Sequence, residues 1–222
     1  MSANGTTANE TGANGDRIYY NRFYGRGGWE YSKEHQREFL VERLIKPLNL
    51  TPGSKVLEIG CGMGLHSGLL HELGFDVTGV DVSEVGIQHA RTNFPGPTFF
   101  AMDLANEEFG EEEFDVIYSR GMSWYHYELD GVNEDGVDVP RATEGLFRKL
   151  KKGGVFVLQI STDFSGGRDP QSGVHYNRLG AYVSLFERFG EVVLVSNWRG
   201  DRLENQEQAE RLKGHIIIAT RK

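Results

Sequence analysis

Three alternate glycines, Gly60, Gly62 and Gly64, follow an apolar run that begins at Val56. Glycine is required where a strand turns tightly into a helix and the backbone must approach a ligand without an intervening Cβ. Asp81 lies about twenty residues beyond Gly60, at the end of the next apolar run, where an acid accepts hydrogen bonds from ribose hydroxyls. The pattern predicts a nucleotide-binding turn. The alternative is a strand-to-helix turn that binds nothing.

The spacing of the glycines argues against a nicotinamide dinucleotide. The pattern G-x-G-x-x-G needs its third glycine where this chain has Leu65, and the chain reads G-x-G-x-G instead. Glu58, two residues before the first glycine, gains nothing beside a phosphate but attracts a cationic amino group or a sulfonium. An NAD-dependent oxidoreductase is therefore a less favoured alternative.

The order of the motifs resembles that of the class I S-adenosylmethionine-dependent methyltransferases. The first motif of that family, an acid followed by spaced glycines, is similar to residues 58–64. Four further segments follow in the family's order: VTGVDVS (77–83), AMDLA (101–105), FDVIYSRG (114–121) and LKKGGVFVLQI (150–160). The resemblance covers residues 33–222, and the ordered series is more specific than any one motif.

The resemblance implies S-adenosylmethionine as cofactor, with S-adenosylhomocysteine as its product. Asp81 looks like the acid that holds the ribose, and Asp103 like the residue that meets the adenine amino group, with Met102 and Leu104 beside the ring. The residues expected at the cofactor are Tyr24, Trp29, Glu58, Gly60, Cys61, Gly62, Gly64, Asp81, Val82, Met102, Asp103, Leu104, Ser119 and Arg120. Arg120 is open to two other roles, binding a substrate carboxylate or holding the acidic loop together.

The loop after the fourth expected strand contains the candidate general base. His126 lies there between Tyr125 and Tyr127. A histidine that titrates near neutrality can accept a proton, and tyrosines can orient a hydroxyl or contact an ammonium. The alternative is a partly buried loop histidine with a structural hydrogen bond. A second loop, residues 164–180, resembles the family's other substrate loop and adds His175 and Tyr176 as candidate contacts.

Six aromatic residues lie among glycines and arginines in the segment 18–32. Their spacing favours neither a clean strand nor a helix. We expect this segment to form a lid over cofactor and substrate, with glycine hinges and with rings, including Tyr20, that face the substrate. The alternative is an N-terminal arm packed on the edge of the sheet.

Strand-like apolar runs alternate with helical patterns along the chain, which predicts an α/β fold. The expected architecture is a Rossmann-like, doubly wound seven-stranded sheet, mostly parallel with an antiparallel last strand, with helices on both faces. After a helix over 32–48, strands are expected near 55–60, 76–81, 97–101, 114–119, 154–161, 190–196 and 214–220. Residues 1–16 are expected to be a disordered tail, 17–50 the lid and first helix, and 51–222 the methyltransferase domain.

The amino-acid composition indicates which class of molecule the protein binds. The net charge of −8 disfavours nucleic acid, and the lid aromatics together with the acidic stretch 103–138 favour a small-molecule acceptor of cationic or aromatic character. The single cysteine, Cys61, excludes a disulfide within the chain, and no metal site is expected because Ser119-Arg120-Gly121 stands where metal-dependent relatives carry carboxylates.

The chain shows neither a signal-peptide pattern nor an apolar segment of membrane-spanning length. We therefore expect a soluble cytoplasmic protein, a monomer or a homodimer. The function that the sequence favours is methyl transfer to an N, O or C nucleophile of a small molecule. An alternative of another class is a non-catalytic S-adenosylmethionine-binding sensor or partner subunit.

Overall fold

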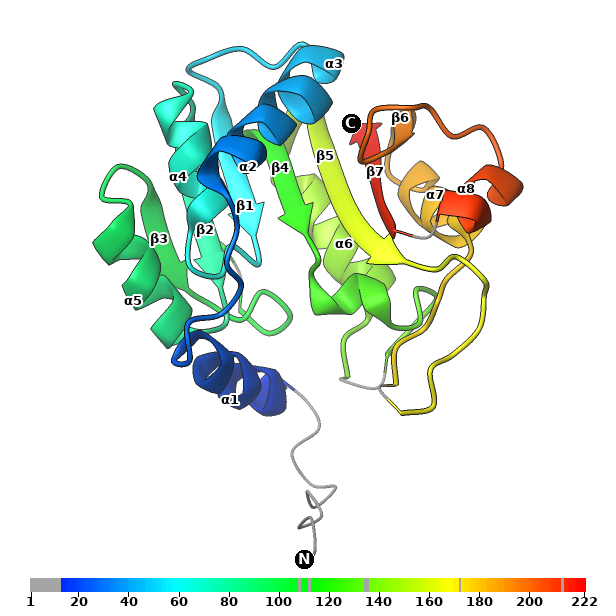
Figure 1. Cartoon of the computed structure of the whole chain (residues 1–222), viewed down its shortest axis with the longest axis horizontal. Helices are drawn as coiled ribbons and strands as arrows, with labels where there is room; N and C mark the ends of the chain where they lie inside the picture. Colours follow the sequence, from blue (N-terminus) through cyan, green and yellow to red (C-terminus); the bar gives the residue numbers. More distant parts are fainter. Residues whose placement is uncertain (1–12, 108, 112, 134–135, 172, 213) are drawn as a thin grey trace, which may run out of the picture.

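The computed structural model describes residues 13–107, 109–111, 113–133, 136–171, 173–212 and 214–222. Its centre is a seven-stranded sheet in the order β3-β2-β1-β4-β5-β7-β6, with helices packed around it (Figure 1). The strands are β1 (Lys55–Ile59), β2 (Asp76–Asp81), β3 (Thr98–Ala101), β4 (Phe114–Arg120), β5 (Leu150–Thr162), β6 (Glu191–Asn197) and β7 (Gly214–Arg221). β1 to β5 pair in parallel, and β7 is antiparallel to both β5 and β6, so the predicted mixed sheet is confirmed.

Helices precede β1 and separate most of the later strands, as in a doubly wound fold. They are α1 (Ala13–Tyr24), α2 (Lys33–Phe39), the π-helical stretch η1 (Leu40–Ile45), α3 (Lys46–Leu48), α4 (Leu65–Glu72), α5 (Glu84–Asn93), the 3₁₀ turn η2 (Ser123–His126), α6 (Val139–Arg148), α7 (Leu179–Glu187) and α8 (Gln206–Leu212). The predicted helix over 32–48 is present as the continuous run of α2, η1 and α3. It begins after the N-cap Ser32, whose Oγ accepts from the His35 amide at 3.3 Å, and ends at Asn49 in the left-handed conformation (φ 52°).

Alternation along the strands divides the core into two layers. Leu57 and Ile59 of β1 face the layer that holds α6 and α7, whereas Val56 packs with Leu40 and Leu69 on the side of η1 and α4. Glu58 shares the face of Val56. The same alternation along β4 puts Arg120 on that face too, because Val116 and Tyr118 both belong to the second layer.

The order of the strands determines where the cleft of the sheet lies. β1 pairs with β2 on one side and β4 on the other, so the connections diverge between β1 and β4 and open a crevice at their carboxyl ends. Helix α1 lies across this edge of the sheet (Figure 1).

The structure corrects two expectations about the first residues. The aromatic segment was expected to be neither strand nor helix, yet α1 runs through it to Tyr24, because Tyr20, Phe23 and Tyr24 follow the three- and four-residue spacing of one helix face. Residues 13–16, placed in the expected disordered tail, begin this helix, and residues 1–12 lie outside the described part of the chain.

A third correction concerns β5, which begins at Leu150, four residues before the predicted start. The lysine- and glycine-rich segment continues the strand instead of turning, because Leu150 pairs with Phe114 and Lys151 Nζ lies 2.9 Å from Asp115 Oδ1, with a register shift between Phe114 and Val116. Within the described ranges, no helix has the length and apolar character needed to cross a membrane.

Candidate active site

A cavity of about 440 Å³ opens at the carboxyl ends of β1, β2 and β4. Its floor is the loop between β1 and α4, one wall is the β4 end with η2, and α1 covers it. The predicted residues that line it are Tyr20, Tyr24, Trp29, Glu58, Gly60, Cys61, Gly62, Asp81, Val82, Met102, Asp103, Leu104, Arg120 and His126. Tertiary structure thus gathers most of the expected cofactor residues with the expected base around one space.

The three glycines adopt conformations that other residues rarely take. Gly60, Gly62 and Gly64 have φ values of 68°, 54° and 80°. Gly64, however, does not line the cavity: a Cβ there would lie 2.7 Å from the Ala90 Cβ and 2.9 Å from Phe99 Cζ. Its small size serves the packing of the loop against α5 and β3, not a contact with a ligand.

Asp81, at the end of β2, is hydrogen-bonded to the glycine loop. Its Oδ2 accepts from the Gly62 amide and its Oδ1 from the Ser83 amide, both at 2.8 Å. Burial raises the pKa of this carboxyl to about 6, and the two amide hydrogen bonds oppose that rise. Since a carboxylate has about four acceptor positions, each oxygen retains capacity for a ligand hydroxyl.

Glu58 is a buried carboxyl on the α4 side of the sheet. It is 3 % exposed and accepts a short hydrogen bond from Ser67 Oγ. Burial raises its pKa to about 7, with the Ser67 hydrogen bond and the charge of Arg120 opposing the rise. A carboxyl held near its point of half-ionisation becomes charged when a cation binds beside it.

Asp103 lies beyond β3 and is fixed by its own loop. Its Oδ1 accepts from the Ala105 amide at 3.1 Å and its Oδ2 from Asn106 Nδ2 at 3.0 Å. The neighbouring Met102 amide donates to the Asp81 backbone oxygen at 2.9 Å, which ties this loop to the end of β2.

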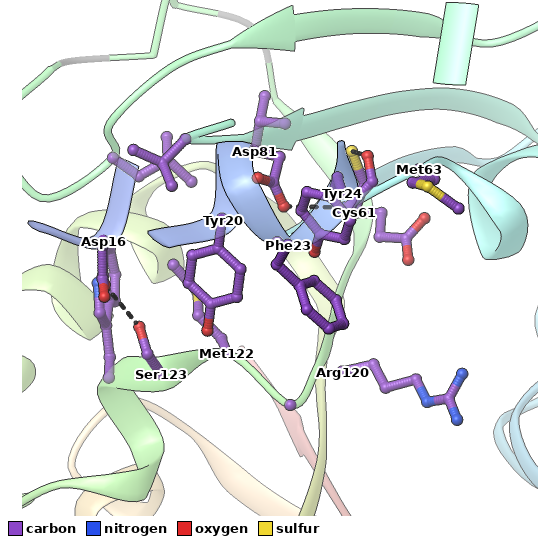
Figure 2. Close-up of a pocket in the computed structure, with 18 of the residues that line it drawn as sticks. Asp16, Tyr20, Phe23, Tyr24, Cys61, Met63, Asp81, Arg120, Met122 and Ser123 are labelled. Carbon is purple, nitrogen blue, oxygen red and sulfur yellow. Dashed lines mark hydrogen bonds between the residues drawn. The ribbon is translucent and has the colours of Figure 1, made fainter. Parts of the chain in front are cut away.

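Helix α1 is attached to both sides of the cavity. Asn21 Oδ1 accepts from Ser83 Oγ at 2.7 Å and from the Val85 amide at 3.2 Å, and Asp16 Oδ2 accepts from Ser123 Oγ at 3.1 Å. Figure 2 shows the side chains of Tyr20, Phe23 and Tyr24 projecting from α1 into the cavity. The first contact reaches the start of α5 and the second reaches η2, so α1 bridges the opening.

Tyr24 packs directly on the glycine loop. Its hydroxyl oxygen lies 2.7 Å from the point that a Cβ on Gly62 would occupy, and its Cδ2 lies 2.9 Å from the corresponding point on Gly86. The bare backbone at both glycines therefore accommodates this ring. Burial, followed by the charge of Asp81, raises the Tyr24 pKa, so the hydroxyl stays protonated at neutral pH.

Arg120 is held by neutral groups. Its Nη1 lies 3.1 Å from His66 Nε2, and its guanidinium carbon lies 4.3 Å from the centre of the Tyr31 ring. His66 Nδ1 is 2.9 Å from the Tyr118 hydroxyl, which donates to Gln159 Oε1 at 2.8 Å. Burial, and then the charge of Arg120, lowers the His66 pKa to about 3, so this ring is neutral.

His126 sits at the end of η2 and lines the cavity, together with His215 of β7. Burial lowers the pKa of both imidazoles; for His126 the charge of His215 adds to this, and for His215 the charge of Arg120 does. His126 is therefore neutral at pH 7 and able to accept a proton.

Five other predicted residues lie outside the cavity lining. Ser119 is fully buried in β4. Tyr125, a predicted substrate contact, is also fully buried, and its hydroxyl lies 3.1 Å from Thr143 Oγ1. His175 and Tyr176 line a separate surface pocket beside α7, although the His175 amide donates to the His126 oxygen at 2.8 Å. The backbone oxygen of Tyr127 accepts from Asn177 Nδ2 at 2.8 Å, which joins the two loops.

Sequence reasoning missed several residues that line the cavity. They include Asp16, Phe23, Met63, His66, Met122, Ser123, Trp124 and His215. His66 is buried and contacts Arg120. The sequence could have indicated His215. It lies near the start of the predicted antiparallel last strand, and an antiparallel strand starts at the edge of the sheet where the parallel strands end. Among the described residues, no group of three or more His, Cys, Asp or Glu side chains is arranged to hold a metal ion.

Comparison with known proteins shows which proteins this chain is similar to. Residues 57–158, from β1 into β5, match the model described as "Methyltransferase domain". Phosphoethanolamine N-methyltransferase 1 of Zea mays is 27% identical over 183 residues, which cover 80% of this chain and 33% of that protein. An uncharacterized methyltransferase of Synechocystis is 29% identical over 160 residues, covering 72% of this chain and 69% of that protein. The chain thus spans a third of the length of the maize relative.

The fold agrees with that match. The N-methyltransferase NodS of Bradyrhizobium japonicum, solved in complex with S-adenosylhomocysteine, superposes with a TM-score of 0.68 at 17% identity, over 93% of this chain and 98% of that one. The glycine loop, the acid that ends β2 and the reversed β7 all lie within this shared architecture or the matched domain. Residues 57–158 thus carry a methyltransferase domain, and the fold around them is similar to that of S-adenosylmethionine-dependent methyltransferases.

Proposed function

We propose that the protein transfers a methyl group from S-adenosylmethionine to an N, O or C nucleophile of a small-molecule acceptor. The observation that carries the proposal is the cavity that joins the glycine loop, the buried acids Glu58 and Asp81, and the neutral imidazole of His126. The similarity to the maize phosphoethanolamine N-methyltransferase supports a small acceptor.

The residues present fit the cofactor. Asp81 retains acceptor capacity on both oxygens for the ribose hydroxyls, and Glu58 offers a carboxylate to the amino group. Asp103 would accept from the adenine amino group, and Met102 and Leu104, which line the same cavity, would lie beside the ring. Tyr24 and Trp29 of the lid segment close the site, and the backbone of Gly60, Cys61, Gly62 and Val82 lines it. When bound, the cofactor supplies an electrophilic methyl on a sulfonium sulfur.

The chain's own contribution to the reaction is alignment, exclusion of water and acceptance of a proton. Helix α1 covers the cavity through its contacts with Ser83 and Ser123. His126 accepts the proton that the nucleophile loses as its bond to the methyl carbon forms. Tyr20, whose pKa burial raises above its usual range, stays a hydroxyl that orients the acceptor.

Calorimetric titration with S-adenosylhomocysteine, with NAD run in parallel, tests the cofactor without the acceptor. Micromolar binding of the former alone is the expected result, and binding of NAD alone would overturn the proposal. A turnover assay on a metabolite panel that includes phosphoethanolamine, read as release of S-adenosylhomocysteine, then tests catalysis. Tight binding with no turnover across the panel favours the non-catalytic binding protein instead.

A further inference from the structure

The acidic stretch 103–138 directs most of its charge away from the cavity. Among its described acids, only Asp103 lines the cavity. Asp115 and Asp130 form ion pairs with a lysine and an arginine that lie outside the cavity lining, and Asp138 caps helix α6. The described part of this stretch therefore supplies the cavity with a single carboxylate.

The polar groups at the carboxyl edge of the sheet differ between its two halves. Along β3, β2 and β1, the cavity is lined by the acids Asp103, Asp81 and Glu58. Beyond β4, it is lined by Ser161 of β5 and His215 of β7, which offer hydrogen-bond donors. Carboxylates suit the hydroxyl and amino groups of the cofactor, so the second half of the edge is left for the methyl acceptor.

Ser161 and His215 are direct cross-strand partners in the antiparallel pair of β5 and β7. Opposite residues of such a pair project from the same face, with Cβ atoms about 4.5–5.5 Å apart, so both side chains can reach one small polar group. His215 Nδ1 is buried and has no hydrogen-bond partner among the described residues. Because a buried N–H without a partner is costly, the ring proton sits on Nε2, which is left to donate into the cavity.

The electrostatic environment of this part of the cavity is positive. His126 of η2 lines it together with His215, and the charges that act on the two rings are those of His215 on His126 and of Arg120 on His215. Asp16 of α1 also lines the cavity, but its charge acts on Tyr20 of the same helix. A positive potential with free donors favours an anion.

We infer that the methyl acceptor carries an anionic group, a carboxylate or a phosphate, and that Ser161 and His215 bind this group by donating hydrogen bonds. The inference rests on the proposed function and names the class of its acceptor. Ser161 donates from its hydroxyl and His215 from Nε2, so the anion receives one charge-assisted hydrogen bond from each of two neighbouring strands. His126 is left to accept the proton of the nucleophile.

The test uses the full chain saturated with S-adenosylhomocysteine and observes the imidazole nitrogens by NMR. The chain has seven histidines, and the His215 signals are those lost in His215→Ala. The probes are sodium acetate, inorganic phosphate and tetramethylammonium chloride. Acetate or phosphate should shift the His215 signals in a saturable way at millimolar concentration, whereas tetramethylammonium should leave them unchanged. The anion that binds more tightly identifies the group that the acceptor carries.

Variants of His215 test the role of Nε2. His215→Ala should weaken the anion about tenfold, the loss of one charge-assisted hydrogen bond, as read from the His126 signals. His215→Gln, whose amide nitrogen reaches about as far as Nε2, should keep most of the affinity. His215→Asn, whose amide reaches only as far as Nδ1, should not. Ser161→Ala should also bind the anion more weakly.

His89→Ala, at an exposed position on α5, is the matched control and should bind both anions as the wild type does. Shifts of the His126 and His215 signals with tetramethylammonium and with neither anion would overturn the inference. Anion binding that His215→Ala leaves unchanged would also overturn it. If the chain bound S-adenosylhomocysteine and neither anion, the inference alone would fail. If it did not bind S-adenosylhomocysteine, the proposed function itself would fail.

Discussion

His66 and Ser67, adjacent residues in the first turn of α4, contact opposite charges on two different strands. Ser67 Oγ donates to the Glu58 carboxylate of β1, and His66 Nε2 lies 3.1 Å from Arg120 Nη1 of β4. Because the glycine loop leads directly into α4, any change in the loop moves both contacts together. One short segment therefore sets the loop geometry and the charge pattern of the cavity.

The raised pKa of Glu58, about 7, predicts that affinity for S-adenosylhomocysteine depends on pH. Below pH 7 the carboxyl is mostly protonated and must lose its proton before it can pair with the ligand ammonium. Affinity should therefore rise from pH 5.5 to pH 8, approaching tenfold per pH unit in the acidic range, with protons released on binding. Calorimetry in buffers of different ionisation enthalpy measures both effects.

The control for that titration is Glu58→Gln, which should bind 10- to 100-fold more weakly, about the strength of a lost charge-assisted hydrogen bond. Its residual pH dependence reports Asp81, whose pKa of about 6 places its titration lower. A wild-type affinity that stays constant between pH 5.5 and 8 contradicts the role given to Glu58.

The same substitution should stabilise the ligand-free protein at alkaline pH. A carboxyl whose pKa rises from 4.5 to about 7 on folding favours the folded state below pH 4.5, and this contribution is lost as pH rises through 7. At pH 8 Glu58→Gln should therefore raise the free energy of unfolding by up to about 3 kcal/mol. At pH 5 the gain should be small, and urea unfolding at both pH values checks the difference.

Gly62→Ala should lower the free energy of unfolding by about 1–2 kcal/mol, because an L-residue is strained in the left-handed backbone of this position, and the new Cβ meets the Tyr24 hydroxyl. Binding of S-adenosylhomocysteine should weaken as well, because the loop or the Tyr24 ring must shift to admit the Cβ. In a Tyr24→Ala background only the backbone strain remains, so the cost of Gly62→Ala should be smaller there. Gly180→Ala, at an open position in α7, is the control. Equal costs in the two backgrounds would show that Tyr24 does not contact the loop.

Asn21→Ala removes the acceptor that joins α1 to Ser83 and Val85. If α1 is a lid, S-adenosylhomocysteine should dissociate about tenfold faster, in keeping with the loss of one to two hydrogen bonds. Arg22→Ala, exposed on the same helix, should behave as wild type. Stopped-flow dissociation measures the rate, and deletion of residues 1–31 gives the limiting case. Unchanged KM and kcat in that stable truncation would leave α1 as a packed arm.

His126→Ala should lower kcat by about 10²- to 10⁴-fold if this residue accepts the acceptor's proton. The imidazole pKa lies below 6.5, so wild-type kcat should be constant near neutrality and fall only in more acidic buffer. His89→Ala provides the control for loss of an exposed imidazole. The base role is lost if the variant keeps most of its kcat at pH 7.5.

The sequence alone predicted the sheet, the glycine loop and Asp81, because each depends on local chemistry. A strand needs an apolar run, a tight turn needs glycine, and the acid follows at a fixed distance along the chain. The helix of α1 was also encoded locally, in the spacing of Tyr20, Phe23 and Tyr24, but the surrounding glycines and arginines obscured it.

Only the tertiary structure decided how the charges are arranged. Arg120 and His66 are 54 residues apart, and Tyr118 and Gln159 are 41 apart, so no window of sequence links them. The exposure of each side chain depends on the same packing. Tyr125 is buried in the core, whereas the neighbouring His126 lines the cavity, and burial raises the pKa of Glu58 to about 7. These properties belong to the layers around a residue, which form only when distant strands and helices meet.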